Sequence, residues 1–215
     1  VVKARLNRVS ADEAAFYGAN LQGALLRDAL LERAHFEDAD LQLADLSGAS
    51  LLDGYFYGAN LSKATLTDAD LAGTDLRRTN LREANLRRAN LQGALLDSAT
   101  LDGASLVEAD LESAYLDDAS LAHADLHEAS LRGADFRYAR LTGANLQRVN
   151  LEQANLEGAN LARARLDSAT MIMTVLYKAN LTAANLHGAR LHHAVLIDAY
   201  LSHTDLQKAD LTEIY

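Results

Sequence analysis

Leucine recurs at every fifth position along nearly the whole chain. Positions spaced five apart from Leu6 to Leu211 hold Leu or Phe, with Ala11 and Met171 as the two exceptions. A small residue, usually Ala, lies two residues before each of them. No Asp, Glu, Lys, Arg or His occupies either place, so every charge falls at the other three positions of a five-residue unit.

This period fits neither standard element. Steps of five rotate by about 140° on an α-helix, so the leucines would spiral around every face. On a plain strand, steps of five would send successive leucines to opposite faces. The apolar spacing instead alternates two and three, as in Ala19, Leu21 and Ala24. A short extended side followed by a corner keeps all of them on one side of the backbone.

Glycine indicates where the corner lies. Eleven of the 12 Gly residues come two positions after the Leu position, and Gly54 is the exception. In a turn from Leu21 to Ala24, Gly23 is the third residue, where a type II turn needs positive φ. Asp, which tolerates positive φ better than most residues, is also common at this place, as at Asp28.

The units resemble a known family. Residues 39–43 (ADLQL), 59–63 (ANLSK) and 89–93 (ANLQG) are similar to pentapeptide repeats, A(D/N)LXX, and the likeness covers nearly the whole chain. The resemblance implies an all-β fold, a right-handed quadrilateral parallel β-helix (solenoid) with 20 residues per coil. About 10–11 coils then fit into a single domain over residues 1–215, giving a rod roughly 50 Å long.

Four sides per coil are also indicated by the phenylalanines. Phe16, Phe36, Phe56 and Phe136 share one phase of a 20-residue period, so we expect them to stack in an interior column. The chain contains no Pro, which would remove a donor from the ladder between coils. The narrow interior explains Ala, because a larger residue there would overpack the core.

The two ends of such a rod expose unpaired backbone and apolar side chains. Residues 10–13 (SADE) match a capping box, within an N-terminal cap over residues 1–15. A short helical turn at residues 10–15 is one interpretation, and an ordinary irregular first coil is the other.

Charge is distributed unevenly over the predicted sides. The formal net charge is −10, from 20 Lys and Arg against 30 Asp and Glu, which argues against direct nucleic-acid binding. Two adjoining sides carry −7 and −5, and a basic collar runs from Arg77 to Arg88. A purely solvated surface is the alternative to a functional one. The predicted acidic face comprises Asp97, Asp102, Glu108, Asp110, Glu112, Asp117 and Asp118.

Near the C-terminus, apolar residues occupy several of the three outward positions of the unit, which are mostly polar elsewhere in the chain. Seven of the eight Tyr also lie on the Phe side, which favours either partner contact or stacking between coils. We interpret the C-terminal cluster as a docking surface, which would also allow a homodimer through the C-terminal coils. Its cover by residues outside this chain is the alternative. The cluster comprises Ile172, Met173, Val175, Tyr177, Val195, Ile197 and Tyr215.

Signals for chemistry are weak. There is no Cys, and the glycines form no phosphate-binding loop. His187, His192, His193 and His203 show no recognised ligand spacing, so we expect no metal, no cofactor and no catalytic residues. No run of 18 apolar residues exists, so membrane insertion is not expected. Composition does not determine the compartment, although a cytoplasmic location is favoured.

Three classes of function remain. The first is a non-enzymatic interaction or scaffold rod that binds a protein partner through its acidic and aromatic faces. The second follows from the resemblance: some members bind DNA gyrase or topoisomerase as DNA mimics that confer antibiotic resistance. A 50 Å duplex carries roughly 30 phosphate charges, whereas here 20 basic residues offset 30 acidic ones. The third class is an idealised or engineered rod without a partner.

Overall fold

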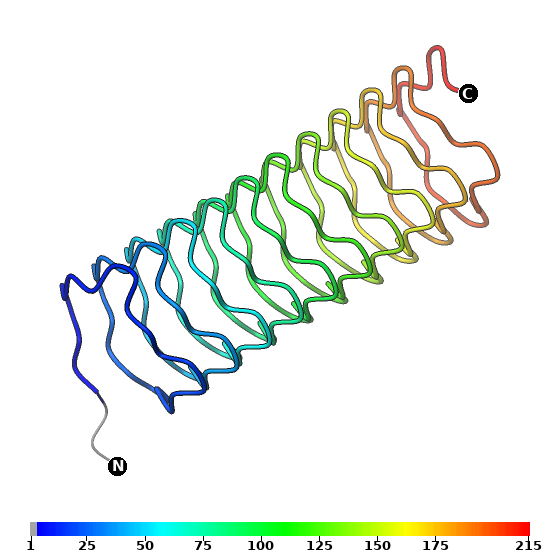
Figure 1. Ribbon diagram of the computed structural model, residues 1–215. Coiled ribbons are helices and arrows are strands. Elements are labelled where there is room, and N and C mark those ends of the chain that lie inside the picture. Colours follow the sequence, from blue (N-terminus) through cyan, green and yellow to red (C-terminus); the bar gives the residue numbers. More distant parts are fainter. Residues whose placement is uncertain (1–3) are drawn as a thin grey trace.

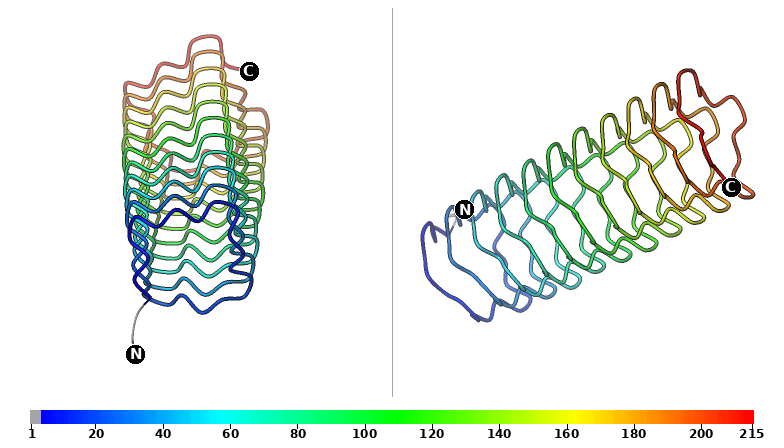
Figure 2. Two further views of the ribbon diagram at one scale, coloured as in Figure 1. Left: turned by 60° about the vertical axis from the view of Figure 1, so that its left-hand side comes forward. Right: turned by 90° about the horizontal axis from the view of Figure 1, so that it is seen from above.

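The computed structural model describes residues 4–215, which wind into one continuous rod of stacked coils (Figure 1). Parallel bridges join residues that are twenty apart, from Arg5 with Leu25 to Arg190 with Asp210. The bridging residues fall into four rows that run along the rod, and Figure 2 shows the stacked coils in two further views. The fold is therefore a β-helix with a twenty-residue register. Its right-handed sense and square cross-section stay predictions.

Each five-residue unit contains one turn and one bridging residue. Within residues 4–215 there is no helix, and every bridge involves a single residue with no longer strand around it. The Ala N–H donates to the carbonyl of the Leu three residues earlier, as Ala24 does to Leu21 at 2.9 Å. The third turn residue has φ between +53° and +70° in every unit.

Glycine is not required at this corner. The predicted positive φ is present, but Asp, Arg, Lys and even Tyr138 and Met173 adopt it as well. Left-handed backbone is unfavourable for residues with a Cβ, by roughly 1–3 kcal/mol. The left-handed conformation persists because hydrogen bonds on both sides of the turn hold the backbone in it.

All five backbone N–H groups of a typical unit find a partner. Two donate to the following coil, one to the preceding coil and one across the turn. The fifth, on the second turn residue, donates to the Asn or Asp side chain that precedes the Leu. In one unit the bonds are Leu41 N to Asn60 O, Leu43 N to Ser62 O, Asp45 N to Ala24 O, Ala44 N to Leu41 O, and Gln42 N to Asp40 Oδ1.

This accounting explains why the repeat favours Asn and Asp before Leu. The Oδ1 atom accepts the one turn N–H that the backbone leaves free. Asn also has a second group to use: Asn60 Nδ2 donates to Asp40 Oδ1 at 3.0 Å, and Asn80 Nδ2 to Asn60 Oδ1 at 3.1 Å. The same position thus supports its own turn and links successive coils.

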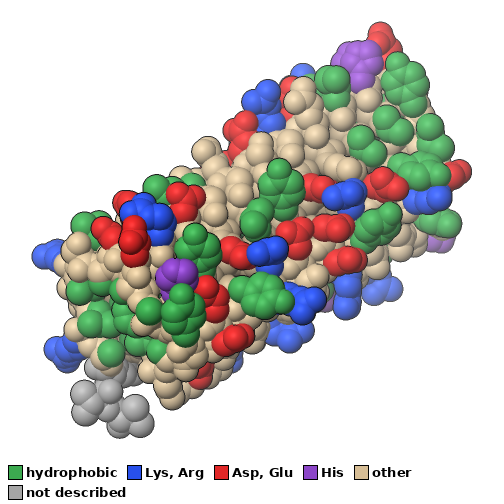
Figure 3. All heavy atoms as spheres, viewed as in Figure 1, with side chains coloured by type: hydrophobic (Ala, Val, Ile, Leu, Met, Phe, Trp, Pro, Cys, Tyr) green, Lys and Arg blue, Asp and Glu red, His purple; other side chains and the backbone are tan. Residues whose placement is uncertain are grey.

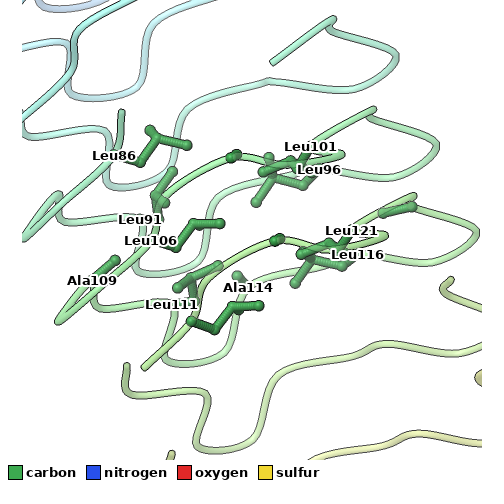
Figure 4. Close-up of a cluster of buried hydrophobic side chains, with 14 of the residues drawn as sticks. Leu86, Leu91, Leu96, Leu101, Leu106, Ala109, Leu111, Ala114, Leu116 and Leu121 are labelled. Carbon is green, nitrogen blue, oxygen red and sulfur yellow. The ribbon is translucent and has the colours of Figure 1, made fainter. Parts of the chain in front are cut away.

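The interior is a continuous column of Leu and Ala side chains. Those from Ala24 to Ala194 are almost entirely buried, and Figure 4 shows leucines of successive coils packed in the interior. The rings of Phe16, Phe36 and Phe56 stack with centroids 4.8 and 4.7 Å apart. Phe136 is fully buried further along the rod. Gly54 leaves space for an aromatic ring, because a Cβ there would lie 3.2 Å from Phe56 Cε2.

Threonine replaces Ala at several inward positions without leaving a polar atom unsatisfied. Thr74 and Thr79 are buried, and each hydroxyl donates at 2.6 Å to the Leu carbonyl that opens the same turn. Thr174 Oγ1 donates at 2.8 Å to Leu151 O on the preceding coil. The buried hydroxyls are therefore compatible with the core because the coil supplies carbonyl acceptors beside them.

The ends of the rod are less well covered. The helical turn considered at residues 10–15 is not formed, since Ser10 bridges Leu30, Ala15 bridges His35, and an ordinary turn lies between them. Residues 1–3 of the predicted cap lie outside the described residues. At the other end Leu211 and Ile214 are exposed. The described part of the chain holds no helix that could cross a membrane.

The stacked Phe column gives a stability prediction. We expect Phe36→Ala to reduce the free energy of unfolding by about 3–5 kcal/mol, because it opens a cavity between two rings. Phe36→Leu should cost less than about 1.5 kcal/mol, since Leu fills the equivalent position in other coils. Urea unfolding followed by circular dichroism measures both. Equal losses for the two variants would contradict the packing described.

Candidate functional site

The surface offers faces rather than a cleft. No pocket occurs in the rod formed by residues 4–215, and Figure 3 shows charged and hydrophobic side chains spread over a convex body. A site that shifts pKa values strongly or encloses a small molecule normally needs a concave setting. The candidate sites are therefore surface columns that the twenty-residue register assembles.

Three successive coils bring the predicted C-terminal cluster together, and we call it the C-terminal apolar surface. Val175 bridges Val195, and the Tyr215 N–H donates to Ala194 O, which places Tyr215 in the same column. Tyr177 and Ile197 occupy the neighbouring column two residues on. Hydrophobic side chains gather near this end of the rod in Figure 3. Its residues are Ile172, Met173, Val175, Tyr177, Val195, Ile197 and Tyr215.

Exposure within this surface is graded. Met173, Ile197 and Tyr215 have 50%, 51% and 68% of their surface exposed. The other four residues are half-buried against neighbouring coils. Lys178 Nζ lies 4.6 Å from the centroid of the Tyr177 ring, so a cation borders the apolar area.

Stacking between coils explains part of the aromatic side. The His35 ring lies between Tyr17 and Tyr55, with centroid distances of 4.9 and 4.6 Å. His35 Nδ1 also lies 3.0 Å from Glu37 Oε1. Tyr115 and Tyr138 are exposed elsewhere on this side. The aromatic side thus combines a stacked N-terminal column with exposed single rings.

The predicted acidic residues surround the rod and do not form one face. The twenty-residue register places Asp97, Asp117 and Asp118 on the Phe side and Asp110 and Glu112 on the adjoining one. The other two, Asp102 and Glu108, lie on the two remaining sides. They are close in sequence, but one coil distributes them over four directions.

Arginines of neighbouring coils neutralise some of the seven predicted acidic residues. Arg82 Nη2 lies 2.9 Å from Asp102 Oδ2, and Arg132 Nη1 lies 3.2 Å from Glu112 Oε1. A longer contact of 3.7 Å joins Arg87 and Glu108. Three of the seven acidic residues are therefore paired with arginines about twenty positions away in sequence.

The basic collar is balanced in the same way. Arg77 Nη2 lies 2.7 Å from Asp75 Oδ2, and this hydrogen-bonded contact holds the pKa of Asp75 below its usual value. Arg88 forms a two-bond contact with Asp68 at 2.7 and 2.8 Å. Arg78 lies over the Tyr57 ring, with 5.8 Å from its Cζ to the centroid. The collar presents little free positive charge.

Asp117 is a carboxylate with a raised pKa and a buried oxygen that lacks a hydrogen-bond partner within residues 4–215. Its Oδ1 is buried and accepts no hydrogen bond from any described residue. Burial raises the pKa of Asp117, and the nearby carboxylates of Asp118 and Asp135 add to the increase, while Arg137 opposes it. At Asp102 burial also acts to raise the pKa, but hydrogen bonds from Ser120 and Arg82 outweigh it and lower the pKa.

Three potential metal ligands meet near the C-terminal end, which the linear spacing did not indicate. His192, His193 and Glu213 have ligand atoms within 4.8 Å of one another. His187 and His203 do not join this group. The sequence feature that could have predicted this group is the twenty-residue register, because residues 193 and 213 are twenty apart and therefore stack.

A family model for pentapeptide repeats matches this chain in eight copies. The matched residues are 14–53, 59–97, 79–116, 94–133, 114–153, 144–182 and 174–213. A search of curated proteins finds no match.

Solved structures of the same kind are also similar. HetL, a pentapeptide repeat protein involved in heterocyst differentiation regulation from the cyanobacterium Nostoc sp. strain PCC 7120, is 36% identical. That comparison covers 98% of this chain and 90% of HetL, with a TM-score of 0.50. QnrB1, a plasmid-mediated fluoroquinolone resistance protein, is 20% identical, covering 94% of this chain and 89% of that chain, with a TM-score of 0.51. At that identity the likeness to QnrB1 shows the fold alone.

The position of Asp117 predicts a pH-dependent effect. Because its pKa is raised in the folded state, the ionised carboxylate destabilises the fold above that pKa. We expect Asp117→Asn to stabilise the protein at pH 7 by less than about 1 kcal/mol. The gain should vanish as the pH falls below about 3.9, where Asp is neutral in the unfolded chain too. Thermal unfolding across pH measures this, with Asp38→Asn, at the exposed third turn position of another coil, as control; an equal gain from the control would contradict it.

Proposed function

The chain belongs to the pentapeptide-repeat family, and we propose that it is a non-enzymatic rod that binds protein partners. In this proposal the rod is right-handed and four-sided, and its acidic and aromatic faces supply the contacts. The supporting observation is that three strongly exposed apolar side chains, Met173, Ile197 and Tyr215, lie on neighbouring coils near the C-terminus, whereas the described rod has no pocket. The partner makes its principal contact with the C-terminal apolar surface.

The composition of this surface suits protein recognition. Met and Tyr are enriched at protein interfaces, and Tyr often carries a large share of the binding energy. Met173, Ile197 and Tyr215 are each at least half exposed, and they lie on coils held rigidly by the hydrogen-bond ladder. A rigid apolar surface loses little conformational entropy on binding.

A second copy of the chain is one partner that the end of the rod could accept. Ile214 and Leu211 are exposed beside the C-terminal apolar surface. Their side chains extend the apolar area on which a second copy could pack.

The likeness to HetL suggests a role in regulation. HetL is involved in heterocyst differentiation regulation, and its comparison covers nearly the full length of this chain at 36% identity. We propose by analogy that this chain acts in regulation by binding a protein.

The DNA-mimic alternative finds less support in the distribution of charge. A mimic needs a continuous negative potential along one face. Here the acidic residues surround the rod, and arginines lie against Asp102, Glu108 and Glu112. The −7 and −5 sides remain acidic overall, and they are the observation that keeps this alternative worth testing.

The apolar surface predicts the behaviour of two variants. We expect Tyr177→Ala with Ile197→Ala to weaken self-association at least ten-fold, because both side chains belong to the proposed contact. The matched control is Tyr17→Ala, which has the same phase of the coil at the opposite end. Multi-angle light scattering over a range of concentrations provides the measurement. If the variant and the wild-type protein have the same molar mass at every concentration, a dimer through this surface is excluded, and a pull-down must then identify another partner.

A gyrase supercoiling assay distinguishes the two functions. As an interaction rod, the protein should leave supercoiling and quinolone-induced cleavage unchanged at micromolar concentration. Inhibition or protection that is lost on neutralising Asp97 and Asp118 would replace the proposed function with DNA mimicry.

A further inference from the structure

The last described turn stacks a carboxylate directly beside two imidazoles. His193 Nδ1 lies 3.2 Å from Glu213 Oε2, and the rings of His192 and His193 have centroids 3.9 Å apart. The possible ligand atoms of all three lie within 4.8 Å of one another. Both histidines are half-buried and Glu213 is exposed, so solvent reaches the group. Figure 3 shows histidine side chains at this end of the rod.

Neighbouring side chains orient His192 for ligation. The Thr212 hydroxyl donates to Asp210 Oδ1 at 2.8 Å, because an ionised carboxylate can only accept. That hydroxyl has no second proton, so it accepts from His192 Nδ1–H at 2.7 Å. In neutral His192 the proton is thereby held on Nδ1, and Nε2 keeps a free lone pair. A hydrogen bond from the second ring nitrogen of a histidine, which fixes its tautomer and orientation, is typical of the surroundings of metal sites.

We propose that His192, His193 and Glu213 bind a divalent transition-metal ion, with Zn²⁺ as the best match. Two imidazole nitrogens and one carboxylate oxygen form a ligand set that suits Zn²⁺, whereas Mg²⁺ and Ca²⁺ prefer oxygen ligands alone. Two ligands bound tetrahedrally at about 2.0–2.1 Å lie roughly 3.3 Å apart. The His193–Glu213 distance of 3.2 Å is close to this value, and the ligand atom of His192 lies within 4.8 Å of both.

The site joins two coils at the end of the rod. His192 and His193 belong to one turn, and Glu213 belongs to the equivalent turn one coil later. The amide of His193 donates to Thr212 O at 3.2 Å, a longer bond than in most interior turns. A bound ion would therefore link these two coils beside this long backbone hydrogen bond. Three protein ligands leave a position for water or for a group from a partner.

Calorimetric titration of the full chain, free of any affinity tag and stripped of metal, tests the proposal. We expect ZnCl₂ to bind saturably at one ion per chain, and MgCl₂ to show no such binding. Glu213→Gln and His193→Asn should each weaken Zn²⁺ binding at least ten-fold. Asn suits the positive φ of residue 193. Thr212→Val should also weaken binding at least ten-fold, and Thr212→Ser should restore it, because Thr212 is a positioning residue.

His203→Asn is the matched control. His203 occupies the same place in its unit with φ of 60°, but it lies outside the cluster. Its substitution should leave the Zn²⁺ affinity within two-fold of the wild-type value. The proposal is overturned by the absence of saturable Zn²⁺ binding, or by an equal loss of affinity in His203→Asn. Circular dichroism confirms that each variant remains folded before its titration is compared.

Discussion

The five backbone N–H groups of each five-residue unit form one repeating set of hydrogen bonds, which we call the hydrogen-bond cycle. This cycle is the constraint on which the rest of the structure depends. Four of its N–H groups are satisfied by the backbone and the fifth by an Asn or Asp side chain. The cycle is complete only when each residue lies beside the one twenty positions away. Buried Leu and Ala supply the favourable burial of apolar surface, whereas the ladder determines which coil packs on which. Positive φ at residues such as Met173 is tolerated because the cycle compensates for it.

The candidate surfaces follow from the same register, because it places residues twenty apart in sequence next to one another in columns. Val175 and Val195 become neighbours, and so do Glu213 and His193. Residues close in sequence are separated: Asp102 and Asp110 lie on different sides. The candidate surfaces are therefore short columns on a rigid convex body, which suits recognition of another surface better than conversion of a substrate.

Much of the fold could be predicted from the sequence because it is periodic. The spacing of Leu and Ala indicated which side chains lie inside, and the phase of Phe36 and Phe56 indicated their stacking. The rest depends on the conformation of long side chains, which periodicity does not specify. Examples are Arg78 over the Tyr57 ring and the contact of Arg82 with Asp102. The histidine cluster was missed because its members were compared by linear spacing rather than by register.

The most direct test of the twenty-residue register uses the absence of native Cys. Gln22 Nε2 donates to Gln42 Oε1 at 2.7 Å on adjacent coils. Strands about 4.8 Å apart meet the spacing that a disulfide requires. The double variant Gln22→Cys with Gln42→Cys should form an intramolecular disulfide on mild oxidation, whereas Gln22→Cys with Glu32→Cys should stay reduced. Formation of the second disulfide as readily as the first would contradict the coil described.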